Sequence, residues 1–356
     1  LTRECPAGDP LGDIPWRPLL CIVGALVFFG FTLPRLGFLI SFPTMIVITS
    51  AGGREFAWRD ALLNAAVLTA LSYGLFIVGL LLFVYIPIVW SAYLSFFEAR
   101  NTVTPTRFVG WDNYRYLLND RLFRDSLIVF VVFAVFIVPL TYVCSLGLAL
   151  LLNGLKWGQA FFRSVFFIPT AVSYVIAAII WRFGFFSGAR FGMINSFLRN
   201  FGVDPVNWLG GGNNLYWIAL VSVRLWLQVG FYMILLIAGL NKIPQETYEA
   251  AALDGASGWR LLRWITLPQL TAASAAVIML LLINAFQAFD EFYNMLGSIG
   301  SYPPYGRPPL VHLFLVALGG GQQDLGVGGA GTVILTSIIV VFGIVQNWVL
   351  NRGEKA

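Results

Sequence analysis

Apolar runs long enough to cross a lipid bilayer recur along the chain, separated by polar segments. A helix of about 20 apolar residues crosses the hydrocarbon core, whereas an open strand in lipid leaves backbone groups without hydrogen bonds. The alternation typical of a transmembrane barrel is absent from the sequence. The pattern therefore predicts an all-α membrane protein. Its later spans are expected at about 127–152, 161–183, 215–240, 270–296 and 327–350.

The amino-terminal part leaves several arrangements open. Two short apolar runs, Leu19–Leu33 and Leu36–Ala51, predict two thin helices, a re-entrant hairpin or one long broken helix. Ala61–Phe97 then holds 37 residues without a charge. As one helix this run would extend about 55 Å. We expect a long tilted helix kinked near Pro87. The alternative is two spans joined with almost no loop.

Composition supports a membrane location. Hydrophobic residues make up 58% of the chain and charged residues 11%, against roughly 25% charged residues in soluble domains. A mean hydropathy of +0.80 is too high for a soluble core to hide, so lipid is expected to cover the remainder. The 22 Lys and Arg and 17 Asp and Glu residues form no basic block. Nucleic acid is therefore not expected as a partner.

The sequence lacks the residue patterns of common catalytic sites. It contains no G-x-x-x-x-G-K-[ST] phosphate loop, so this chain is not expected to hydrolyse ATP itself. The three cysteines are far apart, and no metal-ligand spacing is present. The only histidine, His312, lies in an apolar stretch and is expected to be a packed side chain. We therefore predict no catalytic site, no metal and no cofactor in this chain.

The segment 241–268 is the longest polar interval in the carboxyl-terminal half, and it predicts a helix-turn-helix. Pro244 suits the first turn of a helix. Asp254 and Gly255 can end that helix, because glycine readily takes the left-handed conformation. A second short helix is expected from Ser257 until Pro268. Small residues beside a sharp turn would let the surface of another protein approach the backbone.

This segment resembles the EAA motif of ABC importer permeases. Glu249-Ala250-Ala251, three residues, Gly255, nine residues and Ile265-Thr266-Leu267-Pro268 reproduce its complete spacing. In that family the motif forms the coupling helix, which docks into a cleft of a cytoplasmic ATPase. The resemblance implies that 241–268 and the carboxyl terminus are cytoplasmic, an orientation that loop charges alone do not give. It assigns ATPase coupling to Glu249, Ala250, Ala251, Gly255, Ile265, Leu267 and Pro268.

Other segments resemble the carbohydrate-uptake branch of this family, the maltose and glycerol-3-phosphate type. Phe108–Tyr114 is similar to its F-V-G-L-D-N-F segment, and Gly192–Leu209 to its G-x-I-N…N-W-L external loop. Phe286–Asp290 is similar to its fifth core helix. The resemblance covers about residues 67–350 and implies a permease core of six helices. The chain departs from the pattern at Gly297–Pro304, where the family has G-G-P-G.

The amino-terminal part resembles a different family. Leu33–Ile40 and Gly53–Leu62 are similar to the small membrane subunit of tripartite tricarboxylate transporters, over about residues 16–79. The resemblance implies either a fusion or one or two additional anchoring helices. We favour anchoring helices without a transport role of their own. The expected division is an extension of residues 1–60 followed by a permease domain of residues 61–356.

Polar residues inside two of the predicted spans are candidates for a substrate pathway. Charges within spans are costly and usually face a bundle interior or a water-filled cavity. A carbohydrate needs amides and carboxylates for hydrogen bonds and aromatic rings for stacking. The alternative is a structural bridge from Arg224 to Asp290 or Glu291, and these two acids could also lie at the outer membrane surface. The candidate residues are Arg224, Gln228, Tyr232, Asn284, Gln287, Asp290 and Glu291.

Together these patterns favour a permease subunit of an ATP-driven importer for a sugar or a related polyol or sugar phosphate, in a bacterial or archaeal inner membrane. The resemblance implies three protein partners, namely a second homologous permease, an ATPase dimer that binds ATP and Mg, and an external binding protein that delivers sugar to loops 98–126 and 184–214. The alternative is an ion-coupled secondary transporter of the tricarboxylate type. That class needs midplane carboxylates and inverted repeats, and the sequence shows no convincing repeat.

Overall fold

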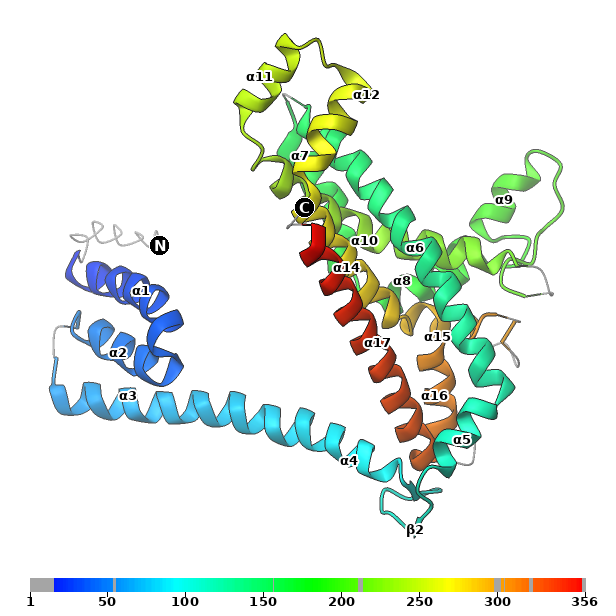
Figure 1. The fold of residues 1–356 in the computed structure, drawn as a ribbon, viewed down its shortest axis with the longest axis horizontal. Coiled ribbons are helices and arrows are strands. Elements are labelled where there is room, and N and C mark those ends of the chain that lie inside the picture. Colours follow the sequence, from blue (N-terminus) through cyan, green and yellow to red (C-terminus); the bar gives the residue numbers. More distant parts are fainter. Residues whose placement is uncertain are drawn as a thin grey trace, which may run out of the picture. The chain divides into compact units, whose positions relative to one another are not determined.

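The chain is nearly all helical in the computed structural model, which describes residues 16–53, 56–155, 157–210, 214–297, 302–303, 305–319 and 323–353 (Figure 1). It divides into two compact units, Leu1–Trp90 and Ser91–Ala356. Six helices of the described chain are long and apolar enough to span a membrane, and one bent pair of helices counts as a seventh. The prediction of an all-α membrane protein is confirmed. Each unit is described below by itself.

The first unit begins with two separate helices, α1 (Trp16–Leu36) and α2 (Phe38–Ser50). They meet at Gly37, whose φ of 72° suits a residue without a side chain. Helix α1 packs against α2, and α2 packs against α3. Since α2 has 13 residues, it extends about 20 Å, less than the thickness of the hydrocarbon core.

The next helix runs continuously from Trp58 to Leu94, so the alternative of two spans in this region is wrong. It comprises α3 (Trp58–Tyr73), two π-helical turns, η1 (Gly74–Val78) and η2 (Leu81–Tyr85), and α4 (Ile86–Leu94). The second π-helical turn lies directly before Pro87. Proline has no N–H for the carbonyl four residues earlier, and a change of helical pitch at this place accommodates the loss.

The second unit contains the remaining spans. It opens with an antiparallel hairpin of β1 (Phe97–Glu98) and β2 (Arg107–Phe108), followed by the short helix α5 (Asp112–Asn119). Its long helices are α6 (Arg121–Asn153), α10 (Tyr216–Leu240), α14 (Thr271–Phe286) with α15 (Asp290–Leu296), and α17 (Leu325–Gly353). Two short helices, α9 (Met193–Arg199) and α16 (Pro309–Ala317), lie in the connecting segments.

The apolar segment predicted as a span at 161–183 is helical, but it is bent and not one straight helix. The structure has α7 (Gln159–Phe167) with the 3₁₀ turn η3 (Ile168–Ala171), then α8 (Tyr174–Ile180) with the π-helical turn η4 (Trp181–Phe185). The two halves are bent by 93°. Pro169 lies in the 3₁₀ turn, and Val172 is extended with ψ 135°. Pro169 has no N–H to donate and Val172 leaves the helical conformation, so a straight helix ends here.

The predicted span at 270–296 is present, but its helix is interrupted. Helix α14 ends at Phe286 and α15 begins at Asp290, with Phe289 at φ −141° and ψ −59° between them. Because of this interruption, Asp290 and Glu291 at the start of α15 do not continue the helical repeat of α14.

Helix α10 lies at the centre of the second unit. It packs against α6, α7, α8, α14 and α15, and residues such as Ala219, Val223 and Met233 are fully buried along it. Two hydroxyl groups reach its backbone, since Ser145 Oγ donates to the carbonyl oxygen of Val229 and Thr170 Oγ1 to that of Leu227, both at 3.1 Å. The neighbouring helices therefore approach α10 closely around residues 227–230.

The segment 241–268 forms the predicted helix-turn-helix, with α11 (Gln245–Leu253), α12 (Gly258–Leu261), the π-helical turn η5 (Leu262–Thr266) and α13 (Leu267–Gln269). Pro244 precedes the first turn as its cap instead of lying within it. Figure 1 shows α11 and α12 at one end of the second unit and the β hairpin with α5 at the opposite end.

Candidate functional site

The turn of the 241–268 segment is built from backbone hydrogen bonds around Gly255. Gly255 has φ 76°, a conformation that costs glycine little and other residues more. The N–H of Ala256 donates to the carbonyl oxygen of Ala251 at 2.9 Å, and that of Gly255 to Ala252 at 3.1 Å. These bonds use carbonyl groups that the end of α11 leaves free, so the turn is fixed by its own backbone.

The residues of the EAA spacing divide into an inward and an outward set. Ala251 is buried, Ile265 and Leu267 are half-buried, and Glu249, Ala250, Gly255 and Pro268 are exposed. Leu253, between the two parts of the spacing, is 90% exposed. Exposed apolar side chains in a polar segment are typical of interaction surfaces.

Inside the second unit, Arg224 of α10 and Glu291 of α15 form a buried ion pair. Arg224 Nη1 lies 2.5 Å from Glu291 Oε1, and the two residues are 3% and 1% exposed. The guanidinium also donates from Nη2 to the backbone carbonyl of Asn284. Of the two acids considered for Arg224, Glu291 is its partner, and Asp290 is half-buried beside it.

Two further polar pairs extend this site along α10. Gln228 Nε2 donates to the phenol oxygen of Tyr174 at 2.9 Å, and Asn284 Nδ2 to that of Tyr232 at 3.0 Å. Arg224, Gln228 and Tyr232 therefore lie on one helix face, as their spacing predicts, and contact α15, α8 and α14 respectively. We call Tyr174, Arg224, Gln228, Tyr232, Asn284 and Glu291 the polar network.

The spacing of three and four residues between Asn284, Gln287 and Glu291 predicts one row along a helix, but Gln287 does not lie in a row with the other two. That row assumes a continuous helix, and the helix ends at Phe286. Gln287 is instead exposed at the end of α14.

Aromatic rings lie next to the polar network. The Arg224 guanidinium carbon is 5.2 Å from the ring centre of Tyr174 and 5.8 Å from that of Phe133. A separate aromatic pair, Trp181 and Trp226, has ring centres 5.0 Å apart, and Trp181 Nε1 donates to Ser222 Oγ at 3.0 Å. The site thus combines amide and phenol groups with flat apolar surfaces.

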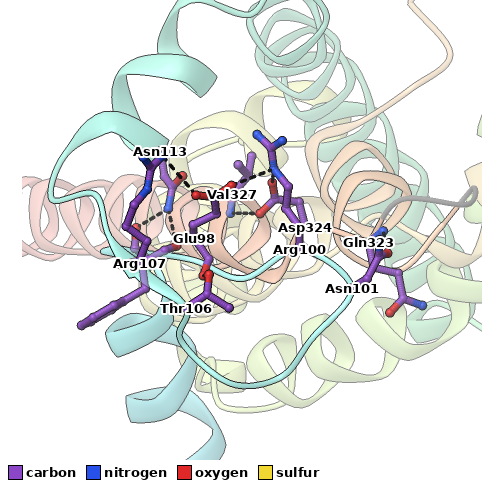
Figure 2. A network of polar contacts seen from close by, with 11 residues as sticks. Glu98, Arg100, Asn101, Thr106, Arg107, Asn113, Gln323, Asp324 and Val327 are labelled. Carbon is purple, nitrogen blue, oxygen red and sulfur yellow. Dashed lines mark hydrogen bonds and ion pairs between the residues drawn. The ribbon is translucent and has the colours of Figure 1, made fainter.

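At the other end of the unit, the Phe108–Tyr114 segment holds the β hairpin in place. Asn113 Nδ2 donates to the carbonyl oxygens of Ser95 and Phe97, both at 2.9 Å. Figure 2 shows Asn113 beside Arg107 and Glu98 of the hairpin. Tyr114 and Ser95 share a 2.6 Å hydrogen bond. Asn113 therefore ties the start of α5 to residues 95–97, which directly follow the end of α4.

The same end carries a cavity of about 540 Å³ between the hairpin, α5, α16 and the start of α17. Arg107 pairs with Glu98 at 3.1 Å, and Arg100 pairs with Asp324 at 3.2 Å (Figure 2). Asp324 Oδ1 also accepts from the backbone N–H of Val327, in the first turn of α17. The cavity is lined by residues 98–116 of the 98–126 loop and by residues 315–327.

The Gly192–Leu209 segment is organised by one buried side chain, Asn195, which is 1% exposed. Its Nδ2 donates to the carbonyl oxygens of Ser187, Ala189 and Val206, at 3.0 to 3.2 Å. Its Oδ1 accepts from the backbone N–H of Val206 and from Trp208 Nε1. Sequence reasoning noted this asparagine only as part of a resemblance.

His312 is a packed side chain, as expected, with 1% of its surface exposed. Its Nε2 lies 3.4 Å from Asp120 Oδ2. Burial, reinforced by the nearby charge of Arg307 and opposed by that of Asp120, lowers the pKa of His312 to about 4. The imidazole is therefore neutral at neutral pH.

Tyr174, Asn113 and Asn195 were absent from the predicted site. Tyr174 follows Ser173 at the bend of the broken span, and its partner is 54 residues away. The departure from the family pattern at Gly297–Pro304 lies mostly outside the described residues, since only Gly297, Tyr302 and Pro303 are described there.

Two family models match the chain. Residues 142–354 match the binding-protein-dependent transport system inner membrane component, which is more than half of the chain. Residues 3–87 match the tripartite tricarboxylate transporter TctB family. Both families that the sequence resembles are thus found, in the same order.

Several characterised proteins are similar over most of their length. The trehalose/maltose transport system permease protein of Thermococcus litoralis is 32% identical over 74% of this chain and 87% of its own. The alpha-glucoside transport system permease protein of Rhizobium meliloti is 30% identical over 74% and 76%. The sn-glycerol-3-phosphate transport system permease protein of Escherichia coli O157:H7 is 28% identical over 72% and 86%.

Among solved structures, a bacterial ABC transporter involved in the import of the acidic polysaccharide alginate has a chain with the same fold. The TM-score is 0.69 at 20% identity, over 83% of this chain and 98% of that chain. A second structure of an alginate transporter, in complex with a periplasmic protein bound to alginate pentasaccharide, gives 0.67.

Proposed function

Because the chain belongs to the family of binding-protein-dependent transport system inner membrane components, we propose that it is the permease subunit of an ATP-driven importer of carbohydrates. It is a multi-pass membrane protein and a transporter component. The proposal adds the substrate class, the partners, the orientation in the membrane and the residues that carry each role.

The exposed 241–268 segment is the observation that supports ATP-driven coupling most strongly. It projects from one end of the second unit (Figure 1), and its turn is held by its own hydrogen bonds. Glu249 and Ala250 are exposed, while Thr266 and Leu270 are buried at the base of the segment. A docked ATPase subunit could therefore push on α11 and transmit the movement through α12, η5 and α13 into α14.

The polar network is the proposed lining of the substrate pathway. It joins α8, α10, α14 and α15 near two interruptions of the spans, at residues 172–173 and 287–289. Irregular backbone at membrane depth is tolerated where it is buried in protein or lines a water-filled cavity. Amides and phenols at such a place can hydrogen-bond the hydroxyl groups of a sugar, and Asp290 and Gln287 lie beside them.

One chain supplies half of a pathway in this proposal, and a second homologous permease supplies the other half. A cytoplasmic ATPase dimer binds ATP and Mg, and an external binding protein delivers sugar to the end with the hairpin, at loops 98–126 and 184–214. Residues 241–268 and the carboxyl terminus are then cytoplasmic. Residues 61–356 form the transport domain, and residues 1–60 add anchoring helices without a transport role.

The coupling role is tested with Glu249→Ala and a matched control, Glu246→Ala, on the same helix. Both glutamates are exposed, so neither change should affect folding. Loss of an interface hot spot costs about tenfold or more in function, and we expect Glu249→Ala to lower sugar uptake by about that factor. Glu246→Ala should stay within about twofold.

The measurement is uptake in membrane vesicles at equal permease levels, with ATP hydrolysis followed in the same sample. Loss of uptake while the permease still reaches the membrane supports the coupling assignment. Full uptake by Glu249→Ala would contradict it.

A further inference from the structure

We propose that the pathway of this permease takes uncharged carbohydrates, and that the Arg224–Glu291 pair excludes anionic ones such as sugar phosphates and uronates. The inference rests on the proposed function and narrows its substrate class. Proteins similar to this chain are named for neutral sugars, for glycerol-3-phosphate and for alginate. Similarity alone does not decide between the classes.

The charges in the spans around the polar network cancel. Residues 174–185 contain one charged residue, Arg182, and residues 216–240 contain one, Arg224. Residues 271–296 contain two, Asp290 and Glu291. Two cations and two anions give a formal sum of zero, so the segments of this chain that form the polar network carry no excess positive charge with which to attract an anion.

The two cations are also already engaged. Arg224 donates to Glu291 and to the backbone carbonyl of Asn284, and it is almost completely buried. Arg182 Nη1 donates to the backbone carbonyl of Asn294 at 2.9 Å, and its guanidinium lies over the ring of Phe183. Asn294 in turn donates to the carbonyl oxygen of Asp290. Although Arg224 Nε has no hydrogen-bond partner, an incoming anion would have to compete with Glu291 and with these carbonyl groups for the two guanidinium groups.

Displacement is unfavourable at this depth. A phosphate or carboxylate that leaves water costs several kcal/mol, and only a well-placed opposite charge offsets that cost. Taking Arg224 from Glu291 would leave that carboxylate buried without its partner, which adds a cost of similar size. A neutral hydroxyl group meets neither cost.

The remaining groups suit an uncharged sugar. Gln228 and Asn284 supply amides, and Tyr174 and Tyr232 supply phenols. These groups are bonded in neutral pairs, so a sugar hydroxyl group can replace either partner without leaving a buried charge.

The first experiment uses the complete importer with its binding protein, reconstituted in vesicles, and measures stimulated ATP hydrolysis. The neutral probes are trehalose, maltose and maltotriose, and the anionic probes are glycerol-3-phosphate, glucose 6-phosphate and alginate trisaccharide. Stimulation by neutral probes alone is expected. Equal or greater stimulation by an anionic probe overturns the inference and leaves carbohydrate import standing. Stimulation by neither set contradicts the proposed function, and the inference with it.

The second experiment isolates the permease from the selectivity of the binding protein. Glycerol-3-phosphate is titrated as an inhibitor of neutral-sugar-stimulated ATP hydrolysis. Glu291→Gln frees the charge of Arg224, so half-maximal inhibition should occur at a concentration about tenfold lower than in the wild type. Asp60→Asn, also a change from acid to amide, at an exposed position of α3 in the extension without a transport role, should match the wild type.

The double variant Arg224→Gln/Glu291→Gln keeps the test decisive if Glu291→Gln does not fold, because it leaves no buried unpaired charge. It should be as insensitive to glycerol-3-phosphate as the wild type. If the pair is purely structural, the inhibition by glycerol-3-phosphate will be unchanged in every variant, and that result would overturn the inference. Stronger inhibition in the double variant alone would also overturn it.

Discussion

Replacing Gly230 with alanine tests how the broken span is held against α10. Gly230 is buried in the middle of α10, and a Cβ at this position would lie 1.8 Å from the backbone oxygen of Phe166 in α7 and 2.5 Å from its carbonyl carbon. The obstacle is backbone, so no side chain can rotate away. The hydroxyl groups of Ser145 and Thr170 donate to neighbouring carbonyls of α10 and hold the helices at this short separation.

The size of the effect follows from the distance. Real Cβ atoms essentially never approach other heavy atoms within 3.0 Å, so α7 would have to move by at least 3.0 − 1.8 = 1.2 Å. Overpacking of a tight core costs about 1–3 kcal/mol and occasionally more. The higher helix propensity of alanine returns at most about 1 kcal/mol. We expect Gly230→Ala to lower the free energy of unfolding by about 2 kcal/mol. Because Tyr174 moves with α7 and α8, its hydrogen bond with Gln228 should also weaken.

The assay is thermal unfolding of the purified permease in detergent, together with sugar uptake. With an unfolding entropy of about 2.1 cal/mol/K per residue, a chain of 356 residues loses about 1.3 °C per kcal/mol, so the melting temperature should fall by about 3 °C. The matched control is Gly147→Ala in α6, where nothing lies within 4 Å of the new Cβ. That variant should be as stable as the wild type or more stable. If Gly230→Ala were as stable as Gly147→Ala, the close approach of α7 and α10 would be wrong.

Two further changes test the loops. Asn195→Leu removes a side chain with five hydrogen bonds to its loop. We expect a loss of about 3 kcal/mol in stability and faster proteolysis within residues 184–210. Asn200→Leu, at an exposed position, should leave the cleavage rate unchanged. His312 has a pKa of about 4 in the folded chain and about 6.5 when unfolded. Between these values the unfolded state binds more protons than the folded state. The free energy of unfolding therefore falls as the pH drops from about 7 to 4, by up to about 3 kcal/mol. The free energy of unfolding is measured by denaturant unfolding for the wild type and for His312→Gln at both pH values. If the two proteins lost the same stability between these pH values, the pKa of about 4 would be refuted.

The spans were predictable because lipid imposes a simple length rule on apolar runs. Residues 215–240 and 127–152 correspond closely to α10 and α6. The helix-turn-helix at 241–268 was also predictable, because Pro244 and Gly255 have strong local conformational preferences.

The breaks in two spans were not predictable to the same degree. Before Val172, Pro169 is a local signal for the break, but hydropathy carries no information about direction. At Phe289 the helix is interrupted with neither proline nor glycine beside it. Tertiary packing decides such breaks, and the expected row of Asn284, Gln287 and Glu291 failed for this reason.

The candidate site was predictable in its residue types and only partly in its partners. The spacing of Arg224, Gln228 and Tyr232 gave one helix face, but the partners Tyr174 and Glu291 come from other helices. Asn113 and Asn195 bond mainly to backbone groups, which leave no trace in a sequence.

The most direct test of the central claim is to purify this chain gently from native membranes and to identify its partners. The account predicts a second permease with an EAA segment and an ATPase with a phosphate-binding loop, in an assembly whose ATP hydrolysis rises with a sugar-loaded binding protein and falls with Glu249→Ala. A large tricarboxylate-transporter subunit in the assembly, without an ATPase, would contradict it.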